Sequence, residues 1–282
     1  MTSWQREWPA PAKLNLFLHV VGRRADGYHL LQTVFRFLDL GDSLTFAPRD
    51  DGRIVLANPL PGMPPDQNLC LRAAWALQQA AGIELGVHIR LVKRLPVGGG
   101  LGGGSSDAAT TLLALNRLWA TGLSPAELQT IGLGLGADVP IFIHGHAAFA
   151  EGIGERFVDV DLPPAWYLVL VPPVAVPTAQ IFAATDLRRD TPAIGAARWR
   201  PGMGGNDLEP VACRLYPQVA EHLEWLRGFG AARMSGSGAC VFAEFPSEAA
   251  ANAAYARLPA AMRGFVACGQ DRSPALAALD AA

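Results

Sequence analysis

Short apolar segments with the period of a β-strand recur in the first third of the chain. Leu14 to Val20 is rich in β-type side chains, and Ser43 to Phe46, Arg53 to Leu56 and Val87 to Val92 share this extended pattern. Between the last two, Leu69 to Ala81 carries apolar side chains at helical spacing. The first third is therefore predicted to mix strands with one helix.

A strand, a glycine-rich loop and a helix are predicted in the middle of the chain. Residues 96–106 read PVGGGLGGGSS, with six glycines in eleven positions. The following apolar residues mark a helix largely buried on one side: Ala108, Ala109, Leu112, Leu113, Leu115, Leu118 and Trp119. Further on, SPAEL predicts a helix running toward Gly134, with Ser124 as its cap, Pro125 in the first position and Glu127 closing a capping box.

Prolines and irregular sequence indicate a boundary in the second half. The clustered prolines are Pro163, Pro164, Pro172, Pro173 and Pro177. An irregular stretch from Thr185 to Gly205 follows them. We therefore expect two lobes, one of residues 1–163 and one of residues 164–282.

The second lobe is predicted to contain both helices and strands. Asn206 and Glu209 have the spacing of a capping box at a helix start. Residues 230–245 have the pattern of strand, glycine turn and strand, and Ser247 to Leu258 is an alanine-rich helix candidate. The tail after Ser273 is expected to fray.

Composition and charge limit the classes of partner. Half of the 282 residues are hydrophobic, which is enough for the cores of two lobes. The formal net charge is −2, so the chain has no general basic field for nucleic acid, and a phosphate site must be built locally. We expect small-molecule substrates, no nucleic acid, and a monomer or weak homodimer.

The cysteines and the apolar stretches indicate a cytoplasmic protein without a membrane partner. Four cysteines lie far apart with no CxxC pair, which argues against a zinc knuckle and a disulfide framework. The N-terminal residues lack an apolar signal core, and the most apolar stretch, 165–176, is interrupted by Pro172 and Pro173.

The glycine loop is the strongest sign of chemistry. Glycine lets main-chain N–H groups approach a ligand closely, and a helix start near Ser105 adds unpaired amides and a positive dipole end, so phosphate is the expected ligand. No lysine precedes Ser105 as a Walker A loop requires, and HRD, DFG and GxSxG are absent from the sequence. A flexible linker is disfavoured, because Leu95, Val97 and Leu101 make the segment apolar.

Three motifs occur in the order found in the GHMP small-molecule kinases, and the chain resembles that family. They are PAKLNL near the N-terminus, PVGGGLGGGSS in the middle and MSGSGAC near the C-terminus. GYH at 27–29 and GADVP at 136–140 resemble the members that act on a cytidine-diphosphate-linked polyol. The resemblance implies an α+β fold of two lobes, the first like ribosomal S5 domain 2 and the second ferredoxin-like. It also implies an ATP-dependent, Mg²⁺-assisted kinase.

The resemblance implies a catalytic pair of Lys13 and Asp138. Asp138 would be the base toward the substrate hydroxyl, and Lys13 would orient it and offset charge on the transferring phosphoryl group. Their spacing alone favours a strand-end lysine and a helix-start aspartate.

Other matching residues are expected to contact the nucleotide. In the loop they are Pro96, Val97, Gly98, Gly99, Gly100, Leu101, Gly102, Gly103, Gly104, Ser105 and Ser106. Both serines could reach phosphate or magnesium, cap the helix, or do both. Asn68 and Lys93 match the adenine pocket, with a helix cap and a surface lysine as equal alternatives. Asp107 is expected to point outward or help hold a hydrated metal.

The acceptor site implied by the resemblance has five residues. Tyr28 would stack on the cytosine, His29 would hydrogen-bond to it, and Phe182 would cover its other face. Asn15 and Thr178 would make further substrate contacts.

Further features leave alternatives open. Residues 235–238 either pack against the glycine loop or form a plain hairpin turn. His144 and His146 would share a face if residues 141–149 formed a strand, but no third ligand is in sight, so we assign no metal site. Another acceptor, a nucleotide-binding regulator without catalysis and an RNA-binding module remain alternatives.

Overall fold

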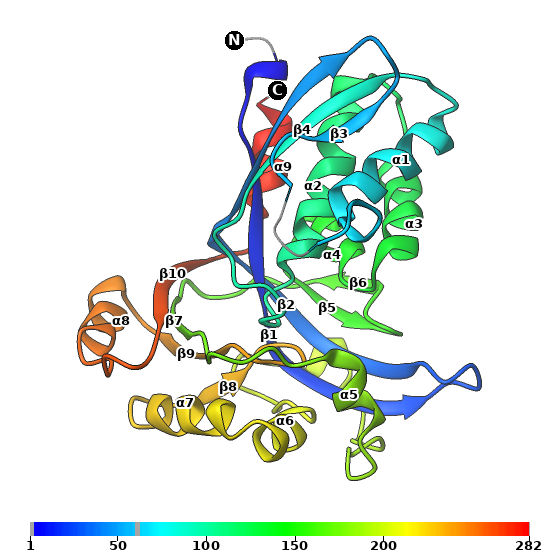
Figure 1. Ribbon diagram of the computed structural model, residues 1–282. Helices are drawn as coiled ribbons and strands as arrows, with labels where there is room; N and C mark the ends of the chain where they lie inside the picture. The colour runs from blue at the N-terminus through cyan, green and yellow to red at the C-terminus, as the bar shows by residue number, and fades with distance from the viewer. Residues whose placement is uncertain (1–2, 60–62, 282) are drawn as a thin grey trace.

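Two long strands form the spine of the protein (Figure 1). The computed structural model describes residues 3–59 and 63–281. Strands β1 (Trp8–Arg23) and β2 (His29–Arg49) pair antiparallel over most of their length. The sequence predicted only short pieces of them, because long runs of both strands are buried and three register shifts interrupt the alternation that marks a strand.

In the described part of residues 50–163, four further strands and four helices belong to the first lobe. The strands are β3 (Ile54–Leu56), β4 (Gly86–Val92), β5 (Ala148–Glu151) and β6 (Arg156–Asp159). The helices are α1 (Leu69–Ala81), α2 (Gly103–Leu118), α3 (Pro125–Leu135) and α4 (Val139–His144). They gather on one side of the sheet, and their apolar faces share a core with β1, β2 and β4 (Figure 1).

Local capping explains where these helices begin. Asn68 accepts hydrogen bonds from the N–H groups of Cys70 and Leu71 and so caps α1. The capping box of Ser124 and Glu127 at the start of α3 is confirmed, with both reciprocal hydrogen bonds present. Short 3₁₀ turns occur at Ser3–Gln5 and Pro65–Gln67.

The second lobe has the strand order of a ferredoxin-like fold. Its strands are β7 (Trp166–Leu170), β8 (Ala232–Met234), β9 (Val241–Phe245) and β10 (Gly264–Gln270). They lie in the order β10-β7-β9-β8. Helices α6 (Glu209–Leu215) and α7 (Pro217–Arg227) connect β7 to β8, and α8 (Glu248–Tyr255) connects β9 to β10, which gives the βαββαβ sequence of that fold. The predicted strand, turn and strand over 230–245 and the alanine-rich helix are confirmed.

Two additional segments run between β7 and α6. They are helix α5 (Thr178–Ala183) and the 3₁₀ turn Ala196–Arg198.

One predicted cap has a different geometry. Helix α6 begins at Glu209 with Leu208 as the N-cap and without a side-chain cap. The Asn206 side chain accepts from the Leu208 N–H, while Glu209 accepts from the Met234 N–H. The predicted reciprocal box does not form because Glu209 is used to fix β8.

The C-terminal tail does not fray as predicted. Residues Pro274–Asp280 form helix α9, capped by Ser273, and Ala275 and Ala278 are buried in the core of the first lobe. The helix contacts β1 and α2 (Figure 1). The tail therefore packs with the first lobe, whereas the predicted range 164–282 assigned it to the second.

The first lobe and the second lobe each have a core, and a further apolar cluster joins the two. It includes Leu14 and Phe17 from β1, Tyr167 from β7, Leu101 from the glycine loop and Cys240 before β9. The glycine loop is thus anchored where the lobes meet.

In the described part of the chain, no helix combines the length and apolar character needed to cross a membrane.

Candidate active site

A cavity of about 500 Å³ lies along the glycine loop and is lined by both lobes. The first lobe contributes Lys13 and Asn15 from β1 and Asp138 before α4. The second lobe contributes residues 236–238 and the α5 residues Thr178 and Phe182. The fold therefore brings motifs from three distant parts of the sequence to one cavity.

The glycine loop is held by backbone contacts to both lobes. The Lys13 N–H donates to the Leu101 carbonyl at 3.0 Å, and the Cys240 N–H donates to the Gly99 carbonyl at 3.0 Å. The Ser235 hydroxyl donates to the Gly100 carbonyl at 2.9 Å. Residues 235–238 are thus packed against the loop, in agreement with the first of the two alternatives.

Gly100 is required by its surroundings. Its φ is +75°, and a Cβ atom at this position would lie 2.1 Å from the Ser235 carbonyl oxygen. Only glycine allows this approach of the two turns without displacement. The loop then runs directly into α2, whose first N–H groups face the anion expected here.

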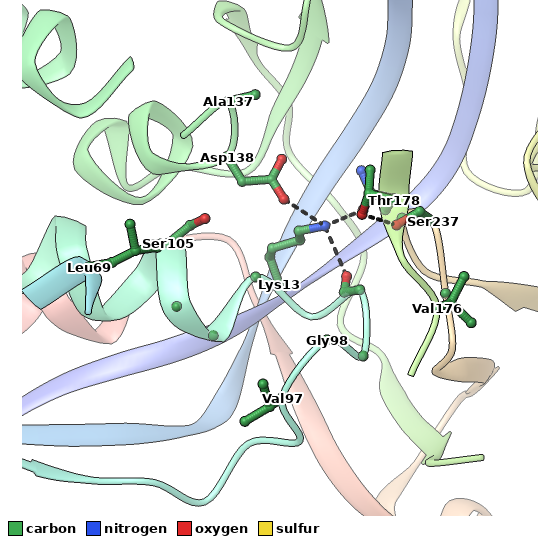
Figure 2. A pocket seen from close by; sticks show the side chains of 18 of the residues that line it. Lys13, Leu69, Val97, Gly98, Ser105, Ala137, Asp138, Val176, Thr178 and Ser237 are labelled. Carbon is green, nitrogen blue, oxygen red and sulfur yellow. Dashed lines mark hydrogen bonds and ion pairs between the residues drawn. The ribbon is translucent and has the colours of Figure 1, made fainter. Parts of the chain in front are cut away.

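Lys13 and Asp138 meet at the centre of the cavity (Figure 2). The Lys13 Nζ lies 3.4 Å from Asp138 Oδ2 and donates to the Gly100 carbonyl at 3.0 Å and to Asn15 Oδ1. The Lys13 side chain is 2% exposed, whereas that of Asp138 is 40% exposed. The ammonium is therefore fixed between strand, loop and carboxylate, and the carboxylate is open to a ligand.

Helix α4 places Asp138. Gly136 ends α3, the Val139 N–H donates back to the Gly136 carbonyl at 3.1 Å, and α4 starts directly after Asp138. Because the turn between the helices is short and Val139 is buried, the carboxylate at its edge has little freedom. This local geometry brings it to a lysine 125 positions away.

The predicted nucleotide residues have different positions. Ser105 lines the cavity, while the Ser106 hydroxyl is buried without a hydrogen-bond partner among the described residues and does not line the cavity. Asn68 lines the cavity and also caps α1, so the two alternatives are compatible. The Leu101 side chain is buried in the apolar cluster between the lobes and does not line the cavity.

Lys93 is part of a buried charge cluster with Asp42 and Asp107. Lys93 Nζ contacts Asp107 Oδ2 at 2.8 Å and also Asp42 Oδ2, so its surface-lysine alternative is wrong. The other Asp42 oxygen accepts from the N–H groups of Arg94 and Leu95. The cluster thus joins β2, the segment entering the glycine loop and the N-terminal half of α2.

The expectation that Asp107 points outward is wrong. Its side chain is 5% exposed, and Oδ1 has no hydrogen-bond partner among the described residues. Burial, opposed by Lys93 and reinforced by the charge of Asp42, raises the pKa of Asp107 to about 7. The two carboxylates outweigh burial at Lys93 and raise the pKa of its ammonium.

Of the five predicted acceptor residues, Asn15, Thr178 and Phe182 line the cavity, whereas Tyr28 and His29 do not. Thr178 Oγ1 and Ser237 Oγ are 2.7 Å apart, which links α5 to the turn at 235–238 (Figure 2). Phe182 lines the cavity and stacks on the His29 ring with the centroids 4.9 Å apart. Tyr28 is 60% exposed and does not line the cavity.

The histidine pair considered for a metal does not form a shared face of a strand. Residues 139–144 are helix α4, and the His144 Nε2 contacts Asp159 Oδ1 at 2.6 Å. Among the residues that the structure describes, no group of three His, Cys, Asp or Glu side chains comes together as a metal site.

Sequence reasoning missed Asp42 and Arg189. Asp42 lies 51 residues from Lys93, and no local pattern distinguishes it from a solvated aspartate in a strand. Arg189 lies in the irregular stretch 185–205 and donates a hydrogen bond to His29, 160 residues earlier. An aspartate and an arginine beside predicted site residues could be found only from the tertiary contacts.

Two family descriptions match the chain, one in each lobe. The family "GHMP kinases N terminal domain" matches residues 68–146, and the family "GHMP kinases C terminal" matches residues 189–264. Together they cover the loop, the helices behind it and much of the second lobe.

Relatives of known name match almost the whole chain. A protein of Dechloromonas aromatica named 4-diphosphocytidyl-2-C-methyl-D-erythritol kinase is 62% identical, over 95% of this chain and 98% of the relative. The protein of the same name from Thiobacillus denitrificans is 61% identical, over 95% and 96%.

Solved structures of similar fold include two kinases with different acceptors. A crystal structure titled 4-(cytidine 5'-diphospho)-2C-methyl-D-erythritol kinase has a TM-score of 0.80 and 38% identity, covering 94% of this chain and 99% of that one. A homoserine kinase from Cytophaga hutchinsonii has a TM-score of 0.67 and 19% identity, covering 95% and 94%, which shows a shared fold alone. From these matches and the arrangement of the three motifs, the chain belongs to the GHMP kinase family.

Proposed function

We propose that the protein transfers the γ-phosphoryl group of ATP to the 2-hydroxyl of 4-diphosphocytidyl-2-C-methyl-D-erythritol. This reaction belongs to the non-mevalonate route to isopentenyl diphosphate. As a GHMP kinase the protein uses ATP. The names of the relatives support the acceptor, and the four free cysteines support a cytoplasmic location.

The meeting of Lys13 and Asp138 beside the glycine loop is the observation that carries the proposal. The hydroxyl oxygen of the acceptor would form a bond to the γ-phosphorus of ATP while the bond from that phosphorus to ADP breaks. The Asp138 carboxylate would accept the proton that the hydroxyl loses. The Lys13 ammonium, 3.4 Å from that carboxylate, would attract the negative oxygens of the transferring group. No covalent intermediate on the protein is needed.

The loop and helix α2 would hold the phosphates. Their N–H groups provide donors that need no net positive charge, which fits a chain with a net charge of −2. Asn68 and Lys93 line the same cavity, which supports the binding of the adenine beside them.

The donor set fits a magnesium ion held largely by the substrate. The Ser105 hydroxyl and the Asp138 carboxylate are oxygen groups in the cavity, the kind of ligand that Mg²⁺ accepts beside water and phosphate. When bound, the ion would neutralise charge on the phosphate oxygens.

Phosphorylation assays with a panel of acceptors test the proposal. With labelled ATP, only the diphosphocytidyl acceptor should be phosphorylated, while mevalonate, homoserine and galactose should remain unlabelled. Labelling of one of these acceptors instead would overturn the assignment of the substrate.

The substitution Asp138→Asn tests the base. It should lower kcat by ~10²–10⁴-fold, the usual contribution of a positioned base, with the affinity for ATP retained. Asp161→Asn, which changes an exposed aspartate outside the cavity, is the control and should leave kcat unchanged. A near-normal kcat in Asp138→Asn would remove the base from the mechanism.

A further inference from the structure

Arg189 connects the segment after α5 to His29 through four hydrogen bonds. Its Nε donates to His29 Nε2 at 3.1 Å. Its two terminal nitrogens donate to the carbonyl oxygens of Leu187, Phe182 and Ala184 at 3.0, 2.9 and 2.7 Å. The guanidinium therefore fixes the position of the His29 ring relative to the backbone that carries Phe182.

This contact determines which His29 nitrogen carries the proton. A guanidinium has donors and no acceptor, so the nitrogen that it faces must present a lone pair. With Nε2 as the acceptor, a neutral His29 ring carries its proton on Nδ1. Burial, followed by the charges of Arg189 and Arg23, lowers the pKa of His29, which favours the neutral ring.

The Nδ1–H group is available to a ligand. Nδ1 has no hydrogen-bond partner within residues 3–59 and 63–281. The ring stacks on Phe182, which lines the cavity, at an interplanar angle of 30°. His29 does not itself line the cavity, but it presents a single donor next to Phe182, which does.

We propose that Arg189 is a positioning residue that makes the enzyme specific for cytosine by fixing the Nδ1–H form of His29, whose Nδ1–H donates to N3 of the base. This inference rests on the proposed cytidyl acceptor. Cytosine N3 carries a lone pair, whereas uracil N3 carries a hydrogen. The Nδ1–H donor therefore pairs with cytosine and opposes uracil at this atom.

Arg189 in this role differs from a residue that only stabilises the fold. Without its guanidinium, the His29 ring would be free to carry the proton on Nε2 and present a lone pair at Nδ1. That form would no longer reject N3–H of uracil. The loss should therefore appear as lost discrimination between bases, and not only as lost stability.

Nitrogen NMR of the ring tests the protonation directly. In the full-length protein labelled with ¹⁵N-histidine, the His29 signals, identified by their loss in His29→Gln, should show a protonated Nδ1 and an unprotonated Nε2 at neutral pH. Adding CDP, with the ATP site filled by a non-hydrolysable analogue, should shift the Nδ1 signal. UDP at the same concentration should shift it much less.

Kinetics with matched variants test the effect on specificity. Arg189→Met should lower the ratio of kcat/KM for the cytidyl acceptor over its uridyl analogue by roughly tenfold, mainly through KM of the cytidyl acceptor. Arg189→Lys, which keeps one donor for Nε2, should restore part of the ratio. Arg188→Met is the control, because the neighbouring Arg188 is 59% exposed and pairs with Asp190.

Each result decides one point. A proton on Nε2 in the wild-type ring, or equal shifts with CDP and UDP, would overturn the inference, and both are measured even if Arg189→Met does not fold. An unchanged ratio in a folded Arg189→Met variant would overturn it as well. If the NMR results are as expected but the cytidyl acceptor is not phosphorylated, the proposed function is wrong and the selection of cytosine by His29 remains.

Discussion

At the scale of residues, the candidate site depends on a few buried charges that are satisfied by neighbours distant in sequence. Lys13 is a lysine with almost no solvent exposure, and a carboxylate, an amide oxygen and a carbonyl oxygen surround its ammonium. Removing such a charge from water is costly unless these partners are fixed. The glycine loop and Asn15 therefore provide the hydrogen-bond acceptors that water provides for an exposed lysine.

The pKa of Asp107 predicts how stability depends on pH. Its pKa is raised from 3.8 to about 7 in the folded protein, so the folded state binds more protons than the unfolded state between these values. The contribution of Asp107 to stability is present at low pH and is lost as the pH rises from about 4 to about 7. Asp107→Asn should therefore gain stability relative to the wild type over this range.

Urea unfolding at several pH values between 5 and 8 measures this difference. The exposed Asp161→Asn serves as the control for removing a carboxylate outside the cluster. A constant difference between Asp107→Asn and the wild type would contradict the raised pKa.

The sequence predicts some of these residues better than others. The glycine loop is evident from composition, because few other functions require so many glycines before a helix. Lys13 and Asp138 lie 125 positions apart, so only the resemblance to a family pointed to them. Asp107 was misjudged because a carboxylate beside a phosphate loop suggests repulsion, and the compensating Lys93 and Asp42 are not apparent in a linear pattern.

At the scale of elements, the glycine loop and the turn at 235–238 behave as one unit. Gly100→Ala would place a Cβ 2.1 Å from the Ser235 carbonyl oxygen and would hold an alanine at a φ of +75°. Gly98→Ala has a similar φ of +70° but no atom within 4 Å of its Cβ. We expect Gly98→Ala to lose about 1–2 kcal/mol of stability, the strain of the left-handed conformation, and Gly100→Ala to lose more.

Thermal unfolding and ATP titration compare this pair. Gly100→Ala should also weaken ATP binding, because the loop must move away from the turn. Equal losses of stability in the two variants would show that the contact with Ser235 is not what requires glycine.

Local chemistry explains which elements were predicted. Helices α1 and α3 have their own caps, and β4 has a clear boundary, so their extents agree with the sequence prediction. Helix α7 and strand β10 were not predicted, and the residues of α4 were considered as a strand. The apolar positions in these segments follow their contacts with other elements and do not show a clear helical or strand period. Tertiary packing decides such segments.

At the scale of the whole molecule, the last helix packs against the first strand. Helix α9 buries Ala278 in the core of the first lobe, while the adjacent Ala277 is exposed. Ala278→Asp should therefore lower the free energy of unfolding by about 2–4 kcal/mol, because it places a charge in an apolar core. Ala277→Asp should change it by no more than about 0.5 kcal/mol.

Chemical denaturation of the two variants checks this expectation. If Ala278→Asp were as stable as Ala277→Asp, the tail would have no part in the core.

Strand β10 and helix α9 also have a consequence for synthesis. Strand β10 pairs with β2 and with β7, and α9 contacts β1, so residues beyond 264 complete structure begun by the first 50 residues. A nascent chain halted before residue 264 would carry all three motifs but would expose the unpaired edge of β2 and an uncovered apolar surface. We expect such an intermediate to aggregate readily, and the site to become fixed only after β10 and α9 are in place.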